Sequence, residues 1–250
     1  MRLLLTLLLC GLTPLARAEW TLEFRRTVAD LPGGAQFIER EARREGRAVR
    51  VQGVFFSAKQ ARFAVIDNAS VDSLGAAMSA AGALAGTNGA YFHPDNTPLG
   101  LMIAGGKKIH ALERAKLLSG VFVVTKGRPR IVRAGKFTPS AADTEALQAG
   151  PFLVEGGAPI SGLNATRVAL RTVVATTGDG RWALLLVSSS TLADSAAVLS
   201  AAAVWPDFRI QQALNLDGGS SSGLWVATKD KPFYRREFST VRNFLAVLPR

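Results

Sequence analysis

Residues 166–188, TRVALRTVVATTGDGRWALLLVS, decide the class of fold. Apolar and β-branched residues flank the run Thr177-Gly178-Asp179-Gly180, and such residues favour strands. Glycines next to an aspartate are typical of the tight turn between two antiparallel strands. We therefore predict a β-hairpin with strands at Thr166–Thr176 and Trp182–Ser188.

Shorter stretches of the same kind occur on both sides of this hairpin. Val49–Phe56 alternates apolar and polar residues, and Arg62–Asp67 follows after a short turn, so these two predict a second hairpin. Further strands are predicted at Gly120–Thr125, Pro129–Arg133, Ala213–Leu216, Leu224–Ala227 and Asn243–Leu248.

Two Ala-rich segments predict helices. Asp72 or Ser73 can cap the first, which extends to about Ala85, and the second covers Ser190–Ala203 before Pro206. Runs of strands with a few inserted helices predict an α+β fold with a mixed, strand-rich sheet. Because no linker or repeat divides residues 19–250, we expect them to form a single domain.

The first 18 residues have the pattern of a signal peptide. Arg2 precedes an apolar run from Leu3 to Leu15, and Ala16-Arg17-Ala18 suits signal peptidase, which would leave Glu19 as the first residue. The apolar run is too short to span a bilayer, and no later segment reaches the required length. We therefore expect a periplasmic or secreted protein without a stable membrane span; an uncleaved anchor, or a lipoprotein modified at Cys10, is the alternative.

The composition limits the chemistry of the exported chain. Cys10 is the only cysteine, so cleavage after Ala18 would remove disulfides and thiol chemistry. The whole chain carries a net charge of +11, and loss of Arg2 and Arg17 leaves +9. This balance favours anionic partners such as phosphate-bearing glycans. The positive residues form no stripe interleaved with aromatic residues, so we do not expect nucleic-acid binding.

Three polar, Gly-rich loops interrupt the apolar pattern. They are TNGAYFHPD at residues 87–95, QAGPFLV at 148–154 and NLDGGSSSG at 215–223, and Arg167 and Arg171 follow the second loop. Glycine is mainly useful where the chain turns sharply or approaches a ligand. Three such loops, each with Asn, Gln or Asp beside the glycines, predict a shared polar site rather than three ordinary turns.

Several sharper motifs do not fit. Residues 219–223 match a G-x-S-x-G nucleophile motif, but a strand follows Ser221, and both histidines, His93 and His110, precede it. Gly105-Gly106-Lys107 lacks the other residues of a phosphate-binding loop. No thiol or histidine pair supports zinc. No cofactor is required by the sequence, while calcium or magnesium near Asp217 stays an open alternative.

The ordered motifs of the three loops resemble those of the phosphodiester glycosidase family, which includes the lysosomal uncovering enzyme and exported bacterial proteins. The matching runs are NGAYFHPD at 88–95, PLGL at 98–101, QAGP at 148–151, ALNLDGGSS at 213–221 and Arg242-Asn243, within a span from about Val49 to Pro249. The resemblance implies hydrolysis of a sugar-1-phosphodiester at the anomeric carbon.

The resemblance also implies roles for individual residues. Asp217 is the candidate carboxylate for an oxocarbenium-like transition state, and Arg171 the candidate clamp for the phosphate. The remaining catalytic candidates are Asn88 and His93, with Asp95 and Glu155 as further acids. The substrate-binding candidates are Gly89, Tyr91, Gln148, Gly150, Asn215, Gly218, Gly219, Ser220 and Asn243.

Two alternatives to the enzyme stay open. One is a non-catalytic protein of the cell envelope that binds an anionic glycan or helps to assemble exopolysaccharide. The other is a periplasmic inhibitor or scaffold whose loops contact another protein. The expected substrate of the enzyme is an extracytoplasmic phosphoglycan, because phosphodiester-linked sugars are features of envelopes and capsules.

Overall fold

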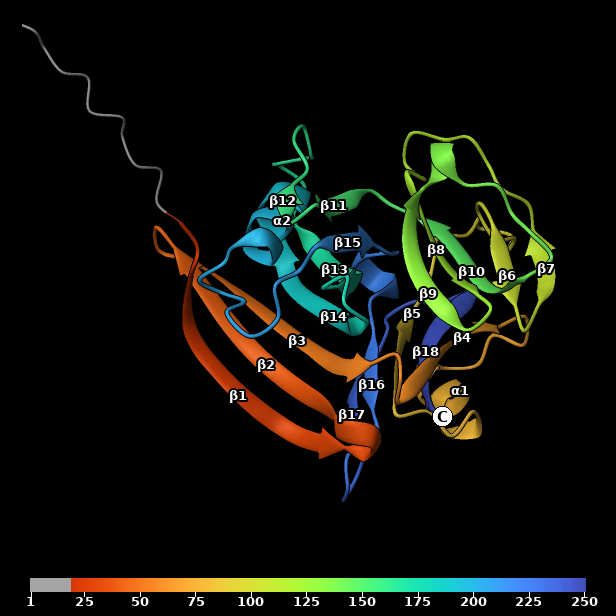
Figure 1. Ribbon diagram of the computed structural model, residues 1–250, viewed down its shortest axis with the longest axis horizontal. Helices are drawn as coiled ribbons and strands as arrows, with labels where there is room; N and C mark the ends of the chain where they lie inside the picture. The colour runs from red at the N-terminus through yellow and green to blue at the C-terminus, as the bar shows by residue number, and fades with distance from the viewer. Residues whose placement is uncertain (1–18) are drawn as a thin grey trace, which may run out of the picture.

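The predicted hairpin forms the centre of an eight-stranded sheet in the computed structural model, which describes residues 19–250 (Figure 1). Strands β13 (Ala169–Thr176) and β14 (Arg181–Ser190) pair antiparallel, as predicted, through the turn at residues 177–180. Gly178 and Gly180 have φ angles of 84° and 96°, a region that other residues rarely adopt. The predicted signal peptide and Cys10 lie outside the described residues.

The eight strands of this first sheet follow the order β1-β2-β3-β14-β13-β15-β11-β12, and neighbouring strands are antiparallel. The strands not yet given are β1 (Thr21–Leu31), β2 (Ala35–Arg44), β3 (Arg47–Ser57), β15 (Gln212–Asn215), β11 (Phe152–Glu155) and β12 (Ala158–Pro159). In Figure 1, β1 to β3 form a long curved wing on the left.

This wing differs from the expectation in two ways. Strands β1 and β2 carry many charged residues and do not show the apolar pattern from which strands were predicted. The predicted hairpin of Val49–Phe56 with Arg62–Asp67 is wrong. Strand β3 has β2 on one side and β14 on the other, so both of its edges are occupied, and the chain leaves it for a different sheet.

Two five-stranded sheets complete the fold. The second sheet has the order β7 (Lys107–His110), β6 (Met102–Ala104), β10 (Asp143–Ala149), β8 (Gly120–Thr125) and β9 (Arg128–Arg133). The third has the order β17 (Phe233–Arg235), β16 (Leu224–Val226), β5 (Ala85–Asn88), β18 (Asn243–Pro249) and β4 (Ala61–Asp67). Apolar side chains from all three sheets share one core, in which Phe63 packs on Phe122 and Trp182.

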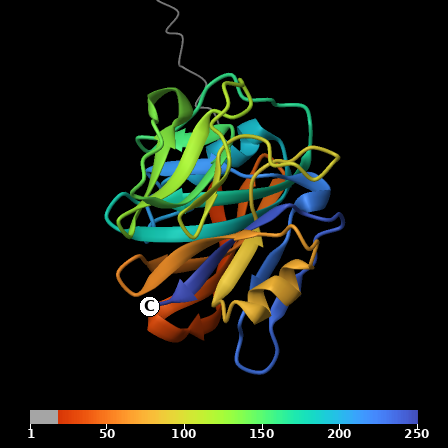
Figure 2. The same cartoon turned by 90° about the vertical axis from the view of Figure 1, so that its right-hand side faces the viewer.

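The helices are shorter than predicted. Helix α1 (Leu74–Ala80) begins after the Ser73 cap and ends where Gly82 takes a φ of 59°, and it lies against β5 and β16 (Figure 2). Helix α2 (Leu192–Ser200) is capped by Thr191 and packs on the first sheet. Three-residue 3₁₀ turns occur at η1 (Pro32–Gly34), η2 (Ala134–Lys136) and η3 (Gly219–Ser221).

These elements change the predicted fold class. Strands dominate residues 19–250 and every pair of neighbouring strands is antiparallel, so the fold is mainly β with three sheets rather than α+β with one mixed sheet. The Ala-rich segments misled the prediction because they extended each helix beyond its true end. No helix in this part of the chain is long and apolar enough to span a bilayer.

Candidate active site

The first and third sheets meet at the ends of β5 and β15, and the structure brings Asp217 to this junction. The amide of Asp217 donates to the carbonyl oxygen of Gly89 at 2.9 Å, which joins the segment after β15 to the segment after β5. The carbonyl oxygen of Asp217 accepts from Nδ2 of Asn88 at 2.8 Å. Both main-chain groups of Asp217 are therefore fixed, which leaves its side chain as the group that can act.

The carboxyl group of Asp217 is half-buried and hydrogen-bonded. Its Oδ1 accepts from the amide of Gly218 at 2.8 Å. Burial raises the pKa of this carboxyl group above its ordinary value, and the hydroxyl of Ser221 and the amide of Gly218 partly oppose the rise. Asp217 therefore lies in a less hydrated environment than a surface carboxylate, where its electrostatic effect on a bound substrate is larger.

Asn88, at the end of β5, binds the loop of residues 216–223 that carries Asp217, here called the Asp217 loop. Its side chain is fully buried. While Nδ2 binds Asp217, Oδ1 accepts from Oγ1 of Thr172 at 2.7 Å and from the amide of Gly223 at 3.2 Å. Because both ends of this amide are occupied by the protein, Asn88 acts on the site by positioning Asp217.

Tyr91 and Asn215 connect this junction to the segment between β10 and β11. The hydroxyl of Tyr91 donates to the carbonyl oxygen of Gly150 at 2.5 Å, and Nδ2 of Asn215 donates to the same oxygen at 2.9 Å and to the Tyr91 hydroxyl at 3.1 Å. Burial raises the pKa of Tyr91, and the carboxylate of Asp217 adds to the rise. Tyr91 is therefore a neutral phenol at physiological pH, close to Asp217.

Arg171 reaches the junction from β13. It is buried, its Nε donates to the carbonyl oxygen of Ser190 at 3.2 Å, and its Nη2 donates to that of Arg167 at 2.7 Å. Burial lowers the pKa of Arg171, and the charge of Arg167 lowers it further. Gly218, the residue after Asp217, packs near this guanidinium, because a Cβ atom built on Gly218 would lie 3.9 Å from Nη1 of Arg171.

Arg167 is a further residue of the site, and no separate role was predicted for it. Its amide donates to Oδ1 of Asn164 at 2.7 Å and its carbonyl holds Arg171, so its main chain is fixed. Its side chain is exposed and takes part in no hydrogen bond or ion pair within residues 19–250. The only signal in the sequence was its position four residues before Arg171. Together the two arginines provide positive charge beside Tyr91.

Gln148 and Asn243 are fully buried, and their polar atoms bind main chain. Oε1 of Gln148 accepts from the amides of Leu101 at 2.9 Å and Glu113 at 3.0 Å. Oδ1 of Asn243 accepts from the amide of Ala90 at 2.7 Å. In this structure these two side chains shape the loops beside the site and leave no polar atom for a ligand.

The glycines of the site fit close main-chain approaches. A Cβ atom at Gly89 would collide with Asn243, and one at Gly150 would collide with the carbonyl of Leu117. Gly219 has a φ of 66° at the start of η3. Ser220 is exposed, and its carbonyl oxygen accepts from the amide of Phe238 at 2.7 Å.

The other predicted residues form no hydrogen bond or ion pair with Asp217 among the described residues. His93 is exposed in the loop after β5, and its imidazole makes no hydrogen bond or ion pair with another described residue. Asp95, in the same loop, accepts from the amide of Thr97 at 2.9 Å. Glu155 forms an ion pair with Arg133 at 2.6 Å. The structure thus places Asp217 and Arg171 near Tyr91, while the carboxylates of Asp95 and Glu155 are bound by other partners.

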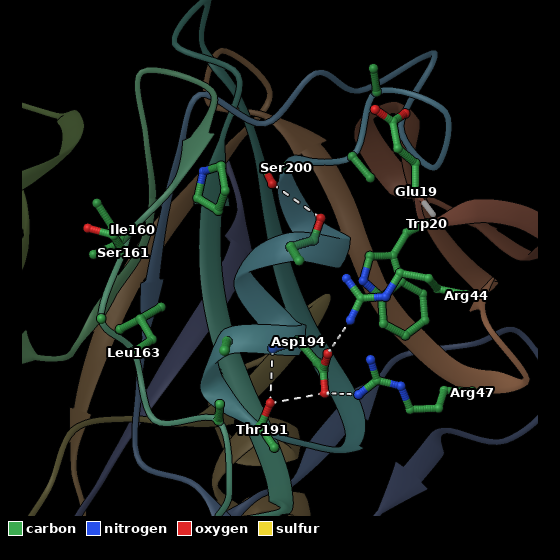
Figure 3. A pocket seen from close by; sticks show the side chains of 17 residues that line it. Glu19, Trp20, Arg44, Arg47, Ile160, Ser161, Leu163, Thr191, Asp194 and Ser200 are labelled. Carbon is green, nitrogen blue, oxygen red and sulfur yellow. Dashed lines mark hydrogen bonds and ion pairs between the residues drawn. The ribbon is translucent and has the colours of Figure 1, made fainter. Parts of the chain in front are cut away.

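A pocket of about 720 Å³ lies between α2 and the start of β1 (Figure 3). Arg44 and Arg47 lie over the ring of Trp20, and each binds one carboxylate oxygen of Asp194, at 2.9 and 3.0 Å. Thr191 also donates to Asp194. Because this carboxylate is fully occupied by protein donors, we place the candidate active site at Asp217. Across residues 19–250, no three His, Cys, Asp or Glu side chains gather as metal ligands.

This mainly β fold brings a carboxylate, a tyrosine and two arginines to the junction of two sheets. Residues 81–248 match the family of phosphodiester glycosidases, and the chain belongs to that family. The match includes Asn88, Gln148, Arg171 and Asp217. Among curated proteins, none matches the chain in sequence.

Three solved structures share the fold. The catalytic domain of zebrafish N-acetylglucosamine-1-phosphodiester alpha-N-acetylglucosaminidase, auto-inhibited by its pro-peptide, has 15% identity and a TM-score of 0.60 over 96% of this chain and 85% of its own. A hypothetical protein from Synechocystis has 15% identity and a TM-score of 0.59 over 86% of this chain, which spans only 62% of its length. A Burkholderia pseudomallei protein described as exported has 13% identity and a TM-score of 0.51, over 88% and 76%.

Proposed function

We propose that this protein hydrolyses the glycosidic bond of a sugar-1-phosphodiester in an extracytoplasmic phosphoglycan. The observation that carries the proposal is the Asp217 carboxylate, bound by the amide of Gly218 and close to Tyr91, which Arg171 and Arg167 also approach, in a chain of the phosphodiester glycosidase family. In the proposed reaction the bond between the anomeric carbon and the phosphate oxygen breaks, and its electron pair leaves with the phosphate monoester. Water supplies the new bond to carbon and releases a proton.

Asp217 is the proposed catalytic residue. As the glycosidic bond lengthens, positive charge develops on the sugar ring, and a nearby carboxylate can stabilise or trap that charge. The amide of Gly218 and the hydroxyl of Ser221 favour the ionised form of Asp217, against the effect of burial. A phosphate monoester is already a stable anion, so the reaction needs less help from a general acid than cleavage of an ordinary glycoside.

The two arginines are the proposed phosphate-binding residues. Arg171 is held by two carbonyl oxygens, which fixes the plane of its guanidinium group and leaves Nη1 for a ligand. Arg167 adds an exposed positive charge on the same segment. Tyr91 and the main-chain amides of Gly219 and Ser220 are proposed to contact the sugar or the phosphate. The amides at the start of a helical turn have no partner within it.

An activity screen tests this proposal. Residues 19–250 would be incubated with a panel of sugar-1-phosphodiesters, with and without EDTA, and free sugar would be measured. We expect release by the wild type and a loss on the order of 10²–10⁴-fold in Asp217→Asn, while Asp230→Asn, which changes an exposed acid, serves as the matched control. Loss of activity with EDTA would indicate the calcium or magnesium alternative.

Two results would contradict the proposal. Full activity in Asp217→Asn would show that this carboxylate does not carry the reaction. Saturable binding of an anionic glycan without any product would favour the non-catalytic glycan-binding alternative.

We further propose that residues 19–250 act as one exported domain after removal of residues 1–18. The description of the Burkholderia relative as exported supports this location. The intact mass of the protein recovered from the periplasm or the medium would test it, because cleavage after Ala18 predicts a chain that begins at Glu19.

A further inference from the structure

A cavity with a basic lining lies beside the second sheet, and Asp217 is not among the residues that line it. It has a volume of about 1050 Å³ and lies between residues 112–119, the end of β9 with η2, and the end of β11. Its lining includes four basic side chains, which are Arg114, Lys116, Arg133 and Lys136. In Figure 1 this region is the upper part of the lobe that contains β8 and β9, next to β11.

The charges of this cavity do not cancel. Arg133 is fixed, because it lies over the ring of Phe152 at 4.2 Å and binds Glu155 at 2.6 Å. The other acid of the lining, Glu113, accepts from the amide of Gly100 at 3.0 Å. Arg114, Lys116 and Lys136, all exposed, take part in no ion pair or side-chain hydrogen bond with any described residue. The four basic and two acidic side chains of the lining thus leave a net charge of +2 with which the cavity can bind an anion.

The segment that lines the cavity also contacts residues next to the candidate active site. Nε2 of Gln148 donates to the carbonyl oxygen of Glu113 at 2.7 Å, so this buried side chain fixes the segment that carries Arg114 and Lys116. The carbonyl of Leu117 packs directly against Gly150, whose own carbonyl receives the hydroxyl of Tyr91. One short segment therefore has the cations on one side and the Tyr91 end of the site on the other.

We propose that this cavity binds a second phosphate of the same substrate, and that the substrate is therefore a polymer of phosphodiester-linked sugars rather than a single sugar phosphodiester. The inference rests on the proposed function, since it assigns the substrate class of that site. Leu117, which is 47% exposed, lies on the segment between the two places and provides an apolar surface over which an extended chain can pass.

A kinetic comparison tests the polymer. The triple variant Arg114→Ala, Lys116→Ala, Lys136→Ala is compared with Lys107→Ala, Lys108→Ala, Lys229→Ala, which removes the same charge from exposed positions outside the cavity. The substrates are a synthetic oligomer of three sugar-1-phosphodiester repeats and the single repeat. The measured quantity is kcat/KM for the oligomer divided by kcat/KM for the single repeat. We expect this ratio to fall roughly 10-fold in the cavity variant, because KM for the oligomer rises. In the control variant we expect the ratio to stay constant. An equal ratio in both variants would overturn the inference.

A binding measurement separates this inference from the proposed function. Calorimetry of Asp217→Asn with inorganic tripolyphosphate needs no turnover, so it is informative even if no substrate is hydrolysed. We expect binding to weaken roughly 10-fold when the cavity substitutions are added and to remain when the control substitutions are added. Inorganic monophosphate that binds as tightly as tripolyphosphate would refute the polymer, because a site for one isolated phosphate would then suffice. Equal loss in both variants would also overturn the inference, since it would reflect net charge alone.

Discussion

The role of Asn88 as the support of the Asp217 loop leads to a prediction that couples stability to activity. Asn88→Ala removes three hydrogen bonds, to Asp217, Thr172 and Gly223, at a side chain that is fully buried. Each buried group left without a partner costs about 1–3 kcal/mol. If the groups relax in part, the free energy of unfolding falls by about 3–5 kcal/mol. For a domain of this size, that corresponds to a decrease in Tm of about 10 °C.

The same substitution should reduce turnover. Without Nδ2 of Asn88, the carbonyl oxygen of Asp217 loses its partner while the amides of Asp217 and Gly218 keep theirs, so the carboxylate is held less firmly in position. A displacement of about 1 Å costs on the order of 100-fold in rate. The assays are thermal denaturation by circular dichroism and release of free sugar at a temperature below the lower Tm.

A matched variant separates the two effects. Thr172→Val removes only the hydroxyl that donates to Oδ1 of Asn88, and leaves the bond between Asn88 and Asp217. We expect it to cost about 1 kcal/mol and to retain most of the activity. An Asn88→Ala protein that unfolds within 1 °C of the wild type, or that turns over substrate at the wild-type rate, would refute the role assigned to Asn88.

Three further predictions follow from the contacts of the site. Burial raises the pKa of Asp217, so its ionisation lowers the stability of the folded state as the pH rises through the pKa of the folded state. We therefore expect the Tm of Asp217→Asn to exceed that of the wild type at pH 7 and to match it at a pH below the pKa of an unfolded aspartate. An equal difference in Tm at both pH values would contradict this prediction. Arg171→Lys cannot bind the carbonyls of Ser190 and Arg167 in one plane, so kcat/KM should fall about 100-fold, and a loss of less than threefold would rule out the clamp. Gly150→Ala places a Cβ atom against the carbonyl of Leu117 and should lower the free energy of unfolding, measured by urea denaturation, by about 1–3 kcal/mol. Gly135→Ala, where a Cβ atom meets nothing within 4 Å, should change it by less than about 0.5 kcal/mol. Similar changes in the two variants would show that the collision at Gly150 is relieved without strain.

The sequence predicted those parts of the fold that depend on local chemistry. The turn at residues 177–180 has glycines with positive φ, and its hairpin has the predicted place. The charged strands β1 and β2 were missed, because they are stabilised by pairing of β1 with β2 and of β2 with β3 and by ion pairs such as that of buried Arg40 with half-exposed Asp207. The partners of β3 and β4 could not be predicted either, since alternation indicates a strand without indicating its neighbour.

The candidate site shows a similar division. The three Gly-rich loops predicted a shared polar site, and the structure brings Asp217, Asn215 and Tyr91 together with Gly150. The sequence could not distinguish a polar side chain that faces a ligand from one that holds the loop itself. Gln148 stands beside glycines just as Asn215 does, yet each of its polar atoms binds main chain inside the protein.

The junction at Asp217 has a consequence for how the protein can be handled. Asn88 comes from the third sheet, Asp217 follows a strand of the first, and Gly150 lies on the segment that joins the second sheet to the first. No fragment that contains only one sheet can hold these groups at their distances. Enzymatic activity, once measured, would therefore report that all three sheets are correctly docked. In refolding or in screens for stabilised variants, it would distinguish native protein from species that retain only part of the β-structure.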